Sequence, residues 1–349
     1  MLILTKLPMI AGITLLMGCA GCSRQPSQSP ADSARLDMFT PLPDMPLAAD
    51  RTVTEAKIVL GRMLYHDPRL SKDQKISCNS CHDLANYGVD GQPTSDGYKS
   101  QRGNRNSPTV YNAAAQFVQF WDGRARDVEA QAKGPVLNPV EMAMPSDRAV
   151  VAVLKSMPGY VAAFQKAFPG EADPVNFDNM AMAIGAFERG LLTPSRWDKF
   201  LKGDGAALSA EEKAGFNKFT DAGCQTCHQG MLLGGNLYQR LGVAKSYPDA
   251  ADPGRFNVTH NDADRMLFKV PSLRNVDKTG PYFHNGKVGT LREAVLQMAD
   301  YQLGKELKAA DVDYIVLFLK TLTGDLPGDY IKAPDLPKST DQTPKAVTD

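Results

Sequence analysis

Two short segments of this chain place two cysteines and a histidine in the same order. They read Cys78-Asn79-Ser80-Cys81-His82 and Cys224-Gln225-Thr226-Cys227-His228, so both have the pattern CxxCH. Two thiols three residues apart can form thioethers with the vinyl groups of one haem, and the adjacent imidazole can then bind the iron as proximal ligand. The sequence therefore predicts two covalently bound haem c groups.

A CxxC pair alone also occurs in zinc knuckles and in redox-active dithiols, which would be the better interpretations in a cytosolic chain. Here Lys6 precedes an apolar run from Leu7 to Met17, which is typical of an export signal. As a helix the run would be about 17 Å long, too short for a hydrocarbon core of about 30 Å. Export leads to the compartment in which haem c is attached, so the signal favours haem at both motifs.

The remaining two cysteines lie at the end of this signal. Leu16-Met17-Gly18-Cys19 resembles the lipobox of bacterial lipoproteins, in which the cysteine is acylated, and Cys22 is the second candidate. Ordinary signal cleavage without a lipid is the alternative. We expect a periplasmic protein. Its only contact with a bacterial membrane would be the N-terminal lipid.

Length and composition predict two domains between two polar ends. The chain has 349 residues, and single cores stop growing near roughly 250–300 residues. Its 39 basic and 39 acidic residues balance, which argues against nucleic acid as a partner. We predict these segments: a lipoprotein-type signal peptide (1–22), a flexible tether (23–46), an N-terminal haem c domain (47–205), a C-terminal haem c domain (206–326) and a Pro-rich tail (327–349).

Helix signals surround both motifs. Capping boxes are predicted at Thr52 with Glu55, at Ser209 with Glu212 and at Thr290 with Glu293. Further apolar periodicity predicts helices at about 148–156, 176–191, 290–301 and 311–322, whereas no segment shows the alternation of a strand. The predicted fold is mostly α, with two cytochrome c-like haem domains packed together.

The sixth iron ligands are not settled by spacing. Three histidines remain outside the motifs, and the 14 methionines are core residues by default because thioethers fill gaps more often than they bind iron. Met298, on a predicted helix, is either a ligand or a packing residue. An iron with both axial positions filled carries electrons, whereas an open position allows catalysis.

Longer strings in both halves of the chain resemble the bacterial di-haem cytochrome c peroxidases, and together they cover about residues 50–325. The strings are Asp67-Pro68-Arg69-Leu70-Ser71, Gly103-Asn104-Arg105-Asn106-Ser107-Pro108-Thr109-Val110, Gln119-Phe120-Trp121-Asp122-Gly123-Arg124, Asn138-Pro139-Val140-Glu141-Met142, Phe268-Lys269-Val270-Pro271-Ser272-Leu273-Arg274-Asn275, Pro281-Tyr282-Phe283-His284-Asn285-Gly286, and Met298 ahead of Tyr301-Gln302-Leu303-Gly304.

The resemblance implies different roles for the two haems. The first, with His82 as proximal ligand, would be the peroxidatic haem, and the second, held by His228 and Met298, would be a high-potential electron store. Thioether ligation fits that role because it raises the reduction potential. The implied substrate is hydrogen peroxide, which is reduced to water with electrons from a small donor protein such as a cytochrome c or a cupredoxin.

The same resemblance assigns roles around the first haem and between the two. Glu141 would be the acid-base residue and Gln131 its polar neighbour, and Trp121 would carry electrons between the haems. Cleaving the O–O bond so that water leaves requires a proton to move between the oxygens, a task for a carboxylate. Asn106 and the backbone carbonyls of Thr279 and Pro281 would bind an inter-haem Ca²⁺, which suits oxygen ligands. A homodimer is also expected.

The chain departs from the family in the loop after the first motif. Many members carry a distal histidine there, which blocks the first iron until the second haem is reduced, but the matching place holds Tyr98. We favour an open first site; the alternatives are a Tyr98 phenolate on the iron or a ring turned into solvent.

Two other functions stay open from the sequence. One is the oxidation of a protein side chain, as in the superfamily member that matures a quinone cofactor. There a tyrosine replaces the methionine of the second haem, whereas this chain keeps Met298. The other is non-enzymatic electron carriage, for which both irons would have filled axial positions.

Overall fold

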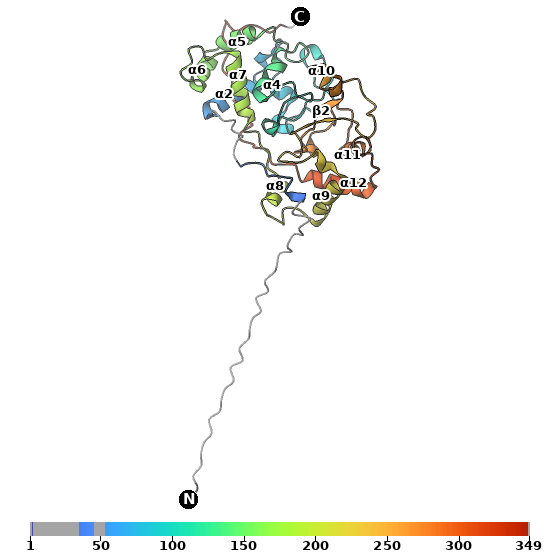
Figure 1. Ribbon diagram of the computed structural model, residues 1–349. Helices are drawn as coiled ribbons and strands as arrows, with labels where there is room; N and C mark the ends of the chain where they lie inside the picture. Colours follow the sequence, from blue (N-terminus) through green and yellow to red (C-terminus); the bar gives the residue numbers. More distant parts are fainter. Residues whose placement is uncertain (1, 3–34, 45–52, 348–349) are drawn as a thin grey trace.

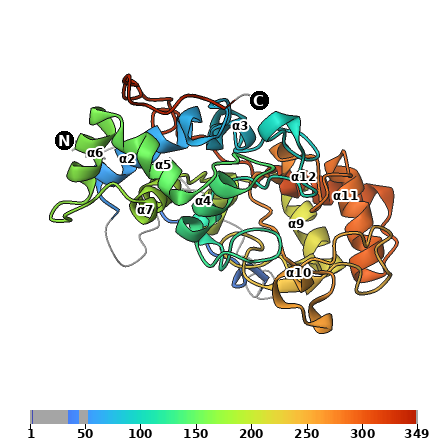
Figure 2. The same ribbon diagram turned by 90° about the horizontal axis from the view of Figure 1, so that it is seen from above.

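The computed structural model describes residue 2, residues 35–44 and residues 53–347, arranged as two helical lobes (Figure 1). Both candidate lipidation cysteines, Cys19 and Cys22, lie outside the described residues. Short helices and long connecting loops make up both lobes, and the turned view in Figure 2 separates them again. The prediction of a mostly α protein is confirmed.

The first lobe is built around two crossing helices, α2 and α7. Their contact is close, because a Cβ atom at Gly61 would lie 1.9 Å from the Ala183 carbonyl oxygen, so only glycine fits there. The core between the helices is apolar and includes Leu64, Tyr65 and Phe187. The helices of this lobe are α2 (Glu55–His66), α3 (Cys78–Cys81), α4 (Val128–Leu137), α5 (Asp147–Lys155), α6 (Pro158–Ala167) and α7 (Phe177–Glu188).

The second lobe pairs α9 with α12 over an aromatic core. Trp197 lies at its centre and contacts Phe216 and Phe318 with ring centroids 5.1 Å away in both cases. The elements of this lobe are α8 (Arg196–Leu201), α9 (Ala210–Ala222), α10 (Phe256–Thr259), α11 (Leu291–Gln297), α12 (Ala309–Lys320) and the antiparallel strands β1 (Tyr238–Arg240) and β2 (Leu267–Lys269).

Single 3₁₀ turns connect many of these elements, and one π-helical turn follows α11. The 3₁₀ turns are Pro68–Leu70, Leu84–Asn86, Tyr98–Ser100, Ala113–Ala115, Cys224–Thr226, Asp262–Asp264 and Val276–Lys278, and the π-turn is Met298–Gln302.

The structure confirms two of the three predicted helix starts and corrects the third. The capping box of Ser209 with Glu212 is present, and the Thr290 hydroxyl accepts from the Glu293 N–H. The first helix, however, begins after Thr54, whose hydroxyl accepts from the Lys57 N–H, and not after Thr52. Thr52 itself lies outside the described residues.

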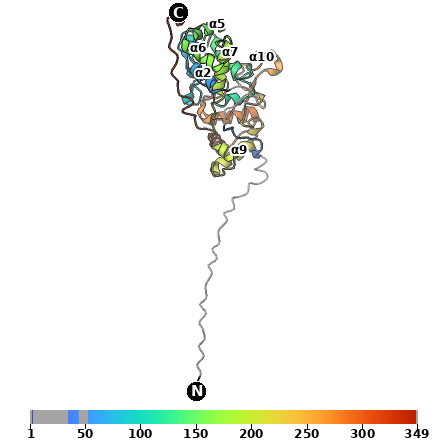
Figure 3. The same ribbon diagram turned by 90° about the vertical axis from the view of Figure 1, so that its left-hand side faces the viewer.

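The C-terminal segment leaves the second lobe and returns to the first. Tyr330 stacks on Phe187 with ring centroids 5.1 Å apart, and its hydroxyl donates to the Phe187 carbonyl at 2.7 Å. Further along, Arg69 Nη1 donates to the Pro337 carbonyl at 2.8 Å. Figure 3 shows the segment running along the outside of the molecule.

Across the described ranges, no helix combines the length and the apolar character needed to cross a membrane.

Candidate haem sites

The second CxxCH motif begins where α9 ends. Gly223 ends that helix, and Cys224 starts a 3₁₀ turn that brings His228 to the wall of a cavity. His228 Nδ1 lies 2.9 Å from the Leu233 carbonyl oxygen. A donated Nδ1–H fixes the ring and leaves Nε2 for a metal, the usual arrangement of an iron-binding histidine. Burial lowers the pKa of His228, which keeps the imidazole neutral.

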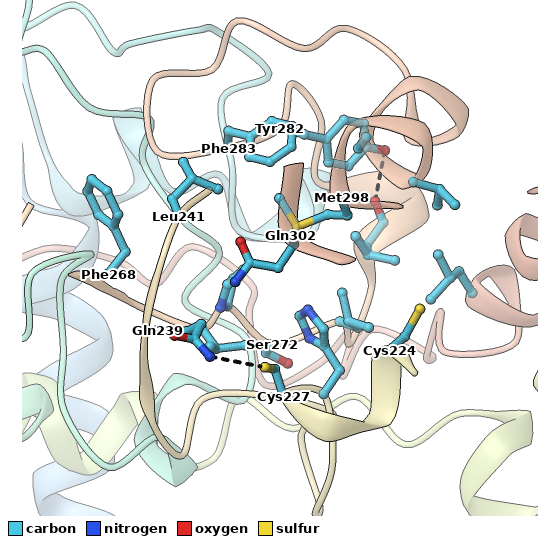
Figure 4. Close-up of a pocket in the computed structure, with 18 of the residues that line it drawn as sticks. Cys224, Cys227, Gln239, Leu241, Phe268, Ser272, Tyr282, Phe283, Met298 and Gln302 are labelled. Carbon is cyan, nitrogen blue, oxygen red and sulfur yellow. Dashed lines mark hydrogen bonds between the residues drawn. The ribbon is translucent and has the colours of Figure 1, made fainter. Parts of the chain in front are cut away.

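Met298 lines the same cavity from the opposite element. It begins the π-helical turn after α11, and such turns recur at functional sites. Figure 4 shows its thioether in one pocket with Cys224 and Cys227. The wall between them is largely apolar and includes Leu241, Phe268 and Leu319. An apolar cavity with two thiols, an oriented imidazole and a thioether fits a haem c with His/Met ligation.

The first motif forms α3, which follows Ser77, and His82 ends that helix. The Tyr65 hydroxyl donates to the His82 carbonyl oxygen at 2.8 Å, which ties the motif to the core of the first lobe. His82 Nδ1 is buried and has no hydrogen-bond partner among the residues that the structure describes. Burial lowers the pKa of this imidazole, with the backbone at Gly88 opposing the shift. A buried neutral imidazole beside two thiols fits a second haem c.

Glu141 lies close to this first motif. Its carboxylate is half-buried and accepts from Asn138 Nδ2 at 2.8 Å. Burial raises the pKa of Glu141, while the nearby charge of Arg124 and the Asn138 bond oppose the shift. Burial raises the pKa of the Cys81 thiol to about 11, and the charges of Asp90 and Glu141 add to the shift.

The loop that carries Tyr98 packs against the Glu141 segment. The Tyr98 N–H donates to the Glu141 carbonyl oxygen at 2.7 Å, and a Cβ atom at Gly97 would lie 1.9 Å from the Val140 carbonyl oxygen. Tyr98 is 7% exposed, so the ring does not stand in solvent. The ammonium groups of Lys72 and Lys99 lie 5.1 and 5.6 Å from its ring centroid.

Gln131 lies on α4 and is partly buried. Within the described chain its side chain makes no hydrogen bond to Glu141, so the structure does not join these two predicted neighbours directly.

Trp121 connects the two lobes. Its indole Nε1–H donates to the Asn106 carbonyl oxygen at 2.9 Å, and its own carbonyl oxygen accepts from the Lys269 N–H at 2.8 Å. The indole ring also lines the cavity that holds His228 and Met298. A packed aromatic ring at this junction is well placed to carry electrons between the lobes.

The three predicted calcium ligands, Asn106, Thr279 and Pro281, line this same cavity. Asn106 is buried, and its amide donates to the Gln92 carbonyl oxygen at 3.0 Å. Among the described residues no group of three or more His, Cys, Asp or Glu side chains could hold a metal ion, so a cation here would depend on amide and carbonyl oxygens.

Sequence reasoning missed several residues at the lobe junction. His284 stacks on Phe268 with ring centroids 4.3 Å apart and contacts the Trp121 ring edge-on at 6.5 Å. Arg105 forms a bidentate pair with Asp252, at 2.6 and 2.9 Å, and bonds Asp122 at 2.5 Å. Arg105 and His284 belong to strings quoted above, but only the fold brings them next to Trp121.

Comparisons with known proteins agree with this geometry. The family model of di-haem cytochrome c peroxidases matches residues 55–206. The chain is 47% identical to cytochrome c551 peroxidase of Pseudomonas aeruginosa over 315 residues, which cover 88% of this chain and 90% of that protein. It is 49% identical to cytochrome c551 peroxidase of Nitrosomonas europaea over 290 residues, with 82% and 85% covered.

A solved structure extends the likeness to the whole fold. A MauG-like protein associated with microbial copper homeostasis superposes with a TM-score of 0.74 at 28% identity, covering 84% of this chain and 98% of that one. The family model covers the first haem motif, and the two relatives match more than four fifths of the chain at 47% and 49% identity, so the chain belongs to the di-haem cytochrome c peroxidase family.

Proposed function

We propose that this protein reduces hydrogen peroxide to water at the first site with electrons that a small donor protein delivers to the second site. Membership of the family supplies the reaction class and two haem c groups. The observation that carries the assignment of the two sites is their difference: a thioether lines the cavity of the second motif, and the loop after the first motif packs against the segment that carries the Glu141 carboxylate.

At the second site, His228 and Met298 hold the haem that stores an electron. The Leu233 carbonyl orients the imidazole. The thioether and the largely apolar wall both favour the reduced form, because each disfavours additional positive charge on the metal. The bound haem supplies one-electron chemistry that side chains lack.

At the first site, Glu141 moves the proton. Its carboxylate takes a proton from the near oxygen of peroxide and gives it to the far one, so that water leaves. A raised pKa suits this task, since it brings the carboxylate closer to the pH at which it must both accept and release a proton. Gln131, on α4, is proposed as a polar residue that helps to hold peroxide.

Trp121 provides the path between the sites. It lines the second cavity and is fixed at both ends by backbone hydrogen bonds, so its ring is held in one position. Ca²⁺ bound by Asn106 with the carbonyls of Thr279 and Pro281 would hold the two lobes at this distance.

Tyr98 stands where a blocking histidine occurs in many members, and we propose that it leaves the first iron open. The Tyr98 N–H donates to the Glu141 carbonyl oxygen, which fixes the loop, and the ammonium groups of Lys72 and Lys99 contact the Tyr98 ring. A phenolate on the iron is the competing arrangement.

The setting of the protein is proposed on sequence features. An export signal and an acylated Cys19, or Cys22, would place it in the periplasm on a lipid anchor, where cytochrome c or cupredoxin donors and a second copy of the chain would be available. Oxidation of a protein substrate is the second candidate function, but the position of Met298 in the second cavity favours electron storage.

The experiment is steady-state peroxide reduction with a reduced cytochrome c, run in parallel on fully oxidised and half-reduced protein. Equal rates are expected, because an open first site needs no activation. Activity only after half-reduction would mean that Tyr98 or another group blocks the iron. Inactivity in both states would move the assignment to protein oxidation or electron carriage.

A further inference from the structure

A buried lysine lines the wall of the second cavity and has no part in the function proposed above. Lys269 is the last residue of β2 and is 5% exposed. It lines the cavity that His228 and Met298 also line, and its backbone N–H holds the Trp121 carbonyl. Lys269 therefore lies at the proposed electron-storing site and contacts Trp121, the proposed path out of it.

The ammonium group has neutral hydrogen-bond partners. Nζ donates to Gln116 Oε1 and, at 3.2 Å, to the Val118 carbonyl oxygen. A buried lysine is ordinarily matched by a carboxylate, because an uncompensated charge in a low-dielectric interior is costly. Burial accordingly lowers the pKa of Lys269 to about 7, with Asp122 opposing the shift.

The charged and titratable groups around Lys269 do not provide that match. Asp122 bonds Arg105 at 2.5 Å and Arg124 at 3.1 Å, so its charge is already balanced. Tyr238 pairs with Lys269 across the two strands and its hydroxyl accepts from Arg255 at 2.6 Å.

On the preceding residue, Phe268 stacks on His284, whose own pKa is lowered by burial. Burial favours the neutral form of His284, and the negative charge of Asp122 is already paired with two arginines, so an added negative charge in the cavity is what would favour protonation of Lys269.

We propose that Lys269 takes up a proton when an electron is stored in the second cavity and releases it when the electron leaves. The donor protein supplies one electron to the haem held by His228 and Met298, and water supplies one proton to Lys269 Nζ, so the charge of the cavity stays constant. When the electron passes on through Trp121, Nζ returns to the neutral amine. This coupling rests on the proposed function of the second site as electron store.

The consequence is a reduction potential that depends on pH. At acid pH the ammonium is present before the electron arrives and raises the potential, and at alkaline pH the neutral amine leaves it low. For a coupled one-electron, one-proton step, a tenfold change in proton concentration moves the potential by up to about 59 mV.

The test is a redox titration of the haem-loaded protein, with both haems followed by their absorption bands between about pH 5.5 and 8.5, on either side of the lysine's lowered pKa. Lys269→Met has no charge at any pH, so its second-haem potential should meet that of the wild type at alkaline pH and lie below it at acid pH. Lys269→Arg is charged at every pH, so its second-haem potential should meet that of the wild type at acid pH and lie above it at alkaline pH.

Three further proteins make the test decisive. Lys245→Met removes an exposed lysine of the same lobe, 60% exposed at its side chain and paired with Asp300, and should leave the potential and its slope unchanged. His284→Gln tests the nearest competing titratable group. Lys269→Gln serves if the longer side chains of the other two variants do not pack, as judged by haem content.

The proposal is overturned if the second-haem potential of Lys269→Met changes with pH in parallel with that of the wild type. It is also overturned if the pH dependence disappears in His284→Gln, or if it belongs to the potential of the first haem. Failure of the proposed function looks different. In that case the haem held by His228 would not be the high-potential one, or peroxide would not be reduced, whatever the slope.

Discussion

The two CxxCH segments share three of five residues, yet they are set into different surroundings. His228 has its Nδ1 fixed by the Leu233 carbonyl and faces an apolar cavity that ends at Met298. In the described part of the chain, the buried Nδ1 of His82 has no such bond, and the loop after its motif packs against the Glu141 segment. The two motifs have the same attachment chemistry, and we propose that the residues opposite each histidine decide whether the site stores an electron or uses one.

The largest effect that separates the sites is expected for Glu141→Gln. The amide keeps the size of the side chain but cannot accept the proton, so peroxide reduction should fall by about 10²–10⁴-fold. Stopped-flow reduction of the second haem by the donor should keep its wild-type rate.

The exposed Glu306→Gln is the matched control and should leave both rates unchanged. In the wild type, activity should fall as the pH drops through the raised pKa of Glu141, because protonation removes the acceptor. Full activity in Glu141→Gln would remove this residue from the chemistry.

The second prediction concerns the stability of the second lobe. Arg274 and Asp198 form a buried pair, with side chains 1% and 3% exposed and bonds of 2.5 and 2.8 Å. Arg274→Met leaves the carboxylate buried and unpaired, so the free energy of unfolding should fall by roughly 3–5 kcal/mol. Denaturant titration, read at the absorption band of each haem, should show the loss at the second haem.

Arg265→Met, which breaks an exposed pair in the same lobe, should cost about 0–1 kcal/mol. Burial alone would raise the pKa of Asp198, but Arg274 lowers it, so this stabilisation is present at neutral pH and is lost as the pH falls through the lowered pKa. If Arg274→Met and Arg265→Met lower the free energy of unfolding equally, the larger contribution that we assign to the buried pair is wrong.

Met298→His should make the second site resemble an ordinary bis-imidazole carrier. An imidazole in place of the thioether lowers the potential, on the order of 0.1 V out of a range of about 0.8 V that axial ligands span. Redox titration of the two haems measures it. Met142→Leu, in the first lobe, is the control; an unchanged second-haem potential in Met298→His would mean that Met298 is a packing residue.

The smallest effect is expected for Tyr98→Phe. If the first site is open, loss of the hydroxyl should change the rate by no more than about twofold, a barrier change below about 0.5 kcal/mol. Tyr98→His should instead give a six-coordinate low-spin first haem in the oxidised protein and a need for reduction before turnover. Spectra of the oxidised proteins distinguish the two, and a low-spin wild type that turns high-spin in Tyr98→Phe would identify Tyr98 as the ligand.

The sequence was most informative where local chemistry decides the outcome. The haem motifs, the capping residue Ser209 and the periodic segments of α5, α7 and α12 all depend on neighbours a few residues away, and the helices appear where they were expected. The start at Thr54 instead of Thr52 shows the limit of the same rule, since two threonines two residues apart compete for one cap.

Contacts between distant segments could not be predicted in this way. Nothing in the local sequence predicts that Lys269 is buried; its contacts with the Trp121 backbone and with Gln116 join segments about 150 residues apart. The His284 ring contacts both Phe268 and Trp121, and Trp121 lies far from it in the sequence. The role of Gln131 as a polar neighbour of Glu141 stays a prediction, since the two residues lie on different elements, α4 and the loop after it.

The C-terminal segment also determines the order in which the protein can be completed. Leu326, Tyr330 and Ile331 pack against the core of the first lobe, although they follow the whole of the second lobe in the sequence. The first haem-binding segment therefore leaves the ribosome long before its lobe can be closed. A chain cut between the lobes would lack these three residues, so part of the apolar core of its first lobe would be exposed.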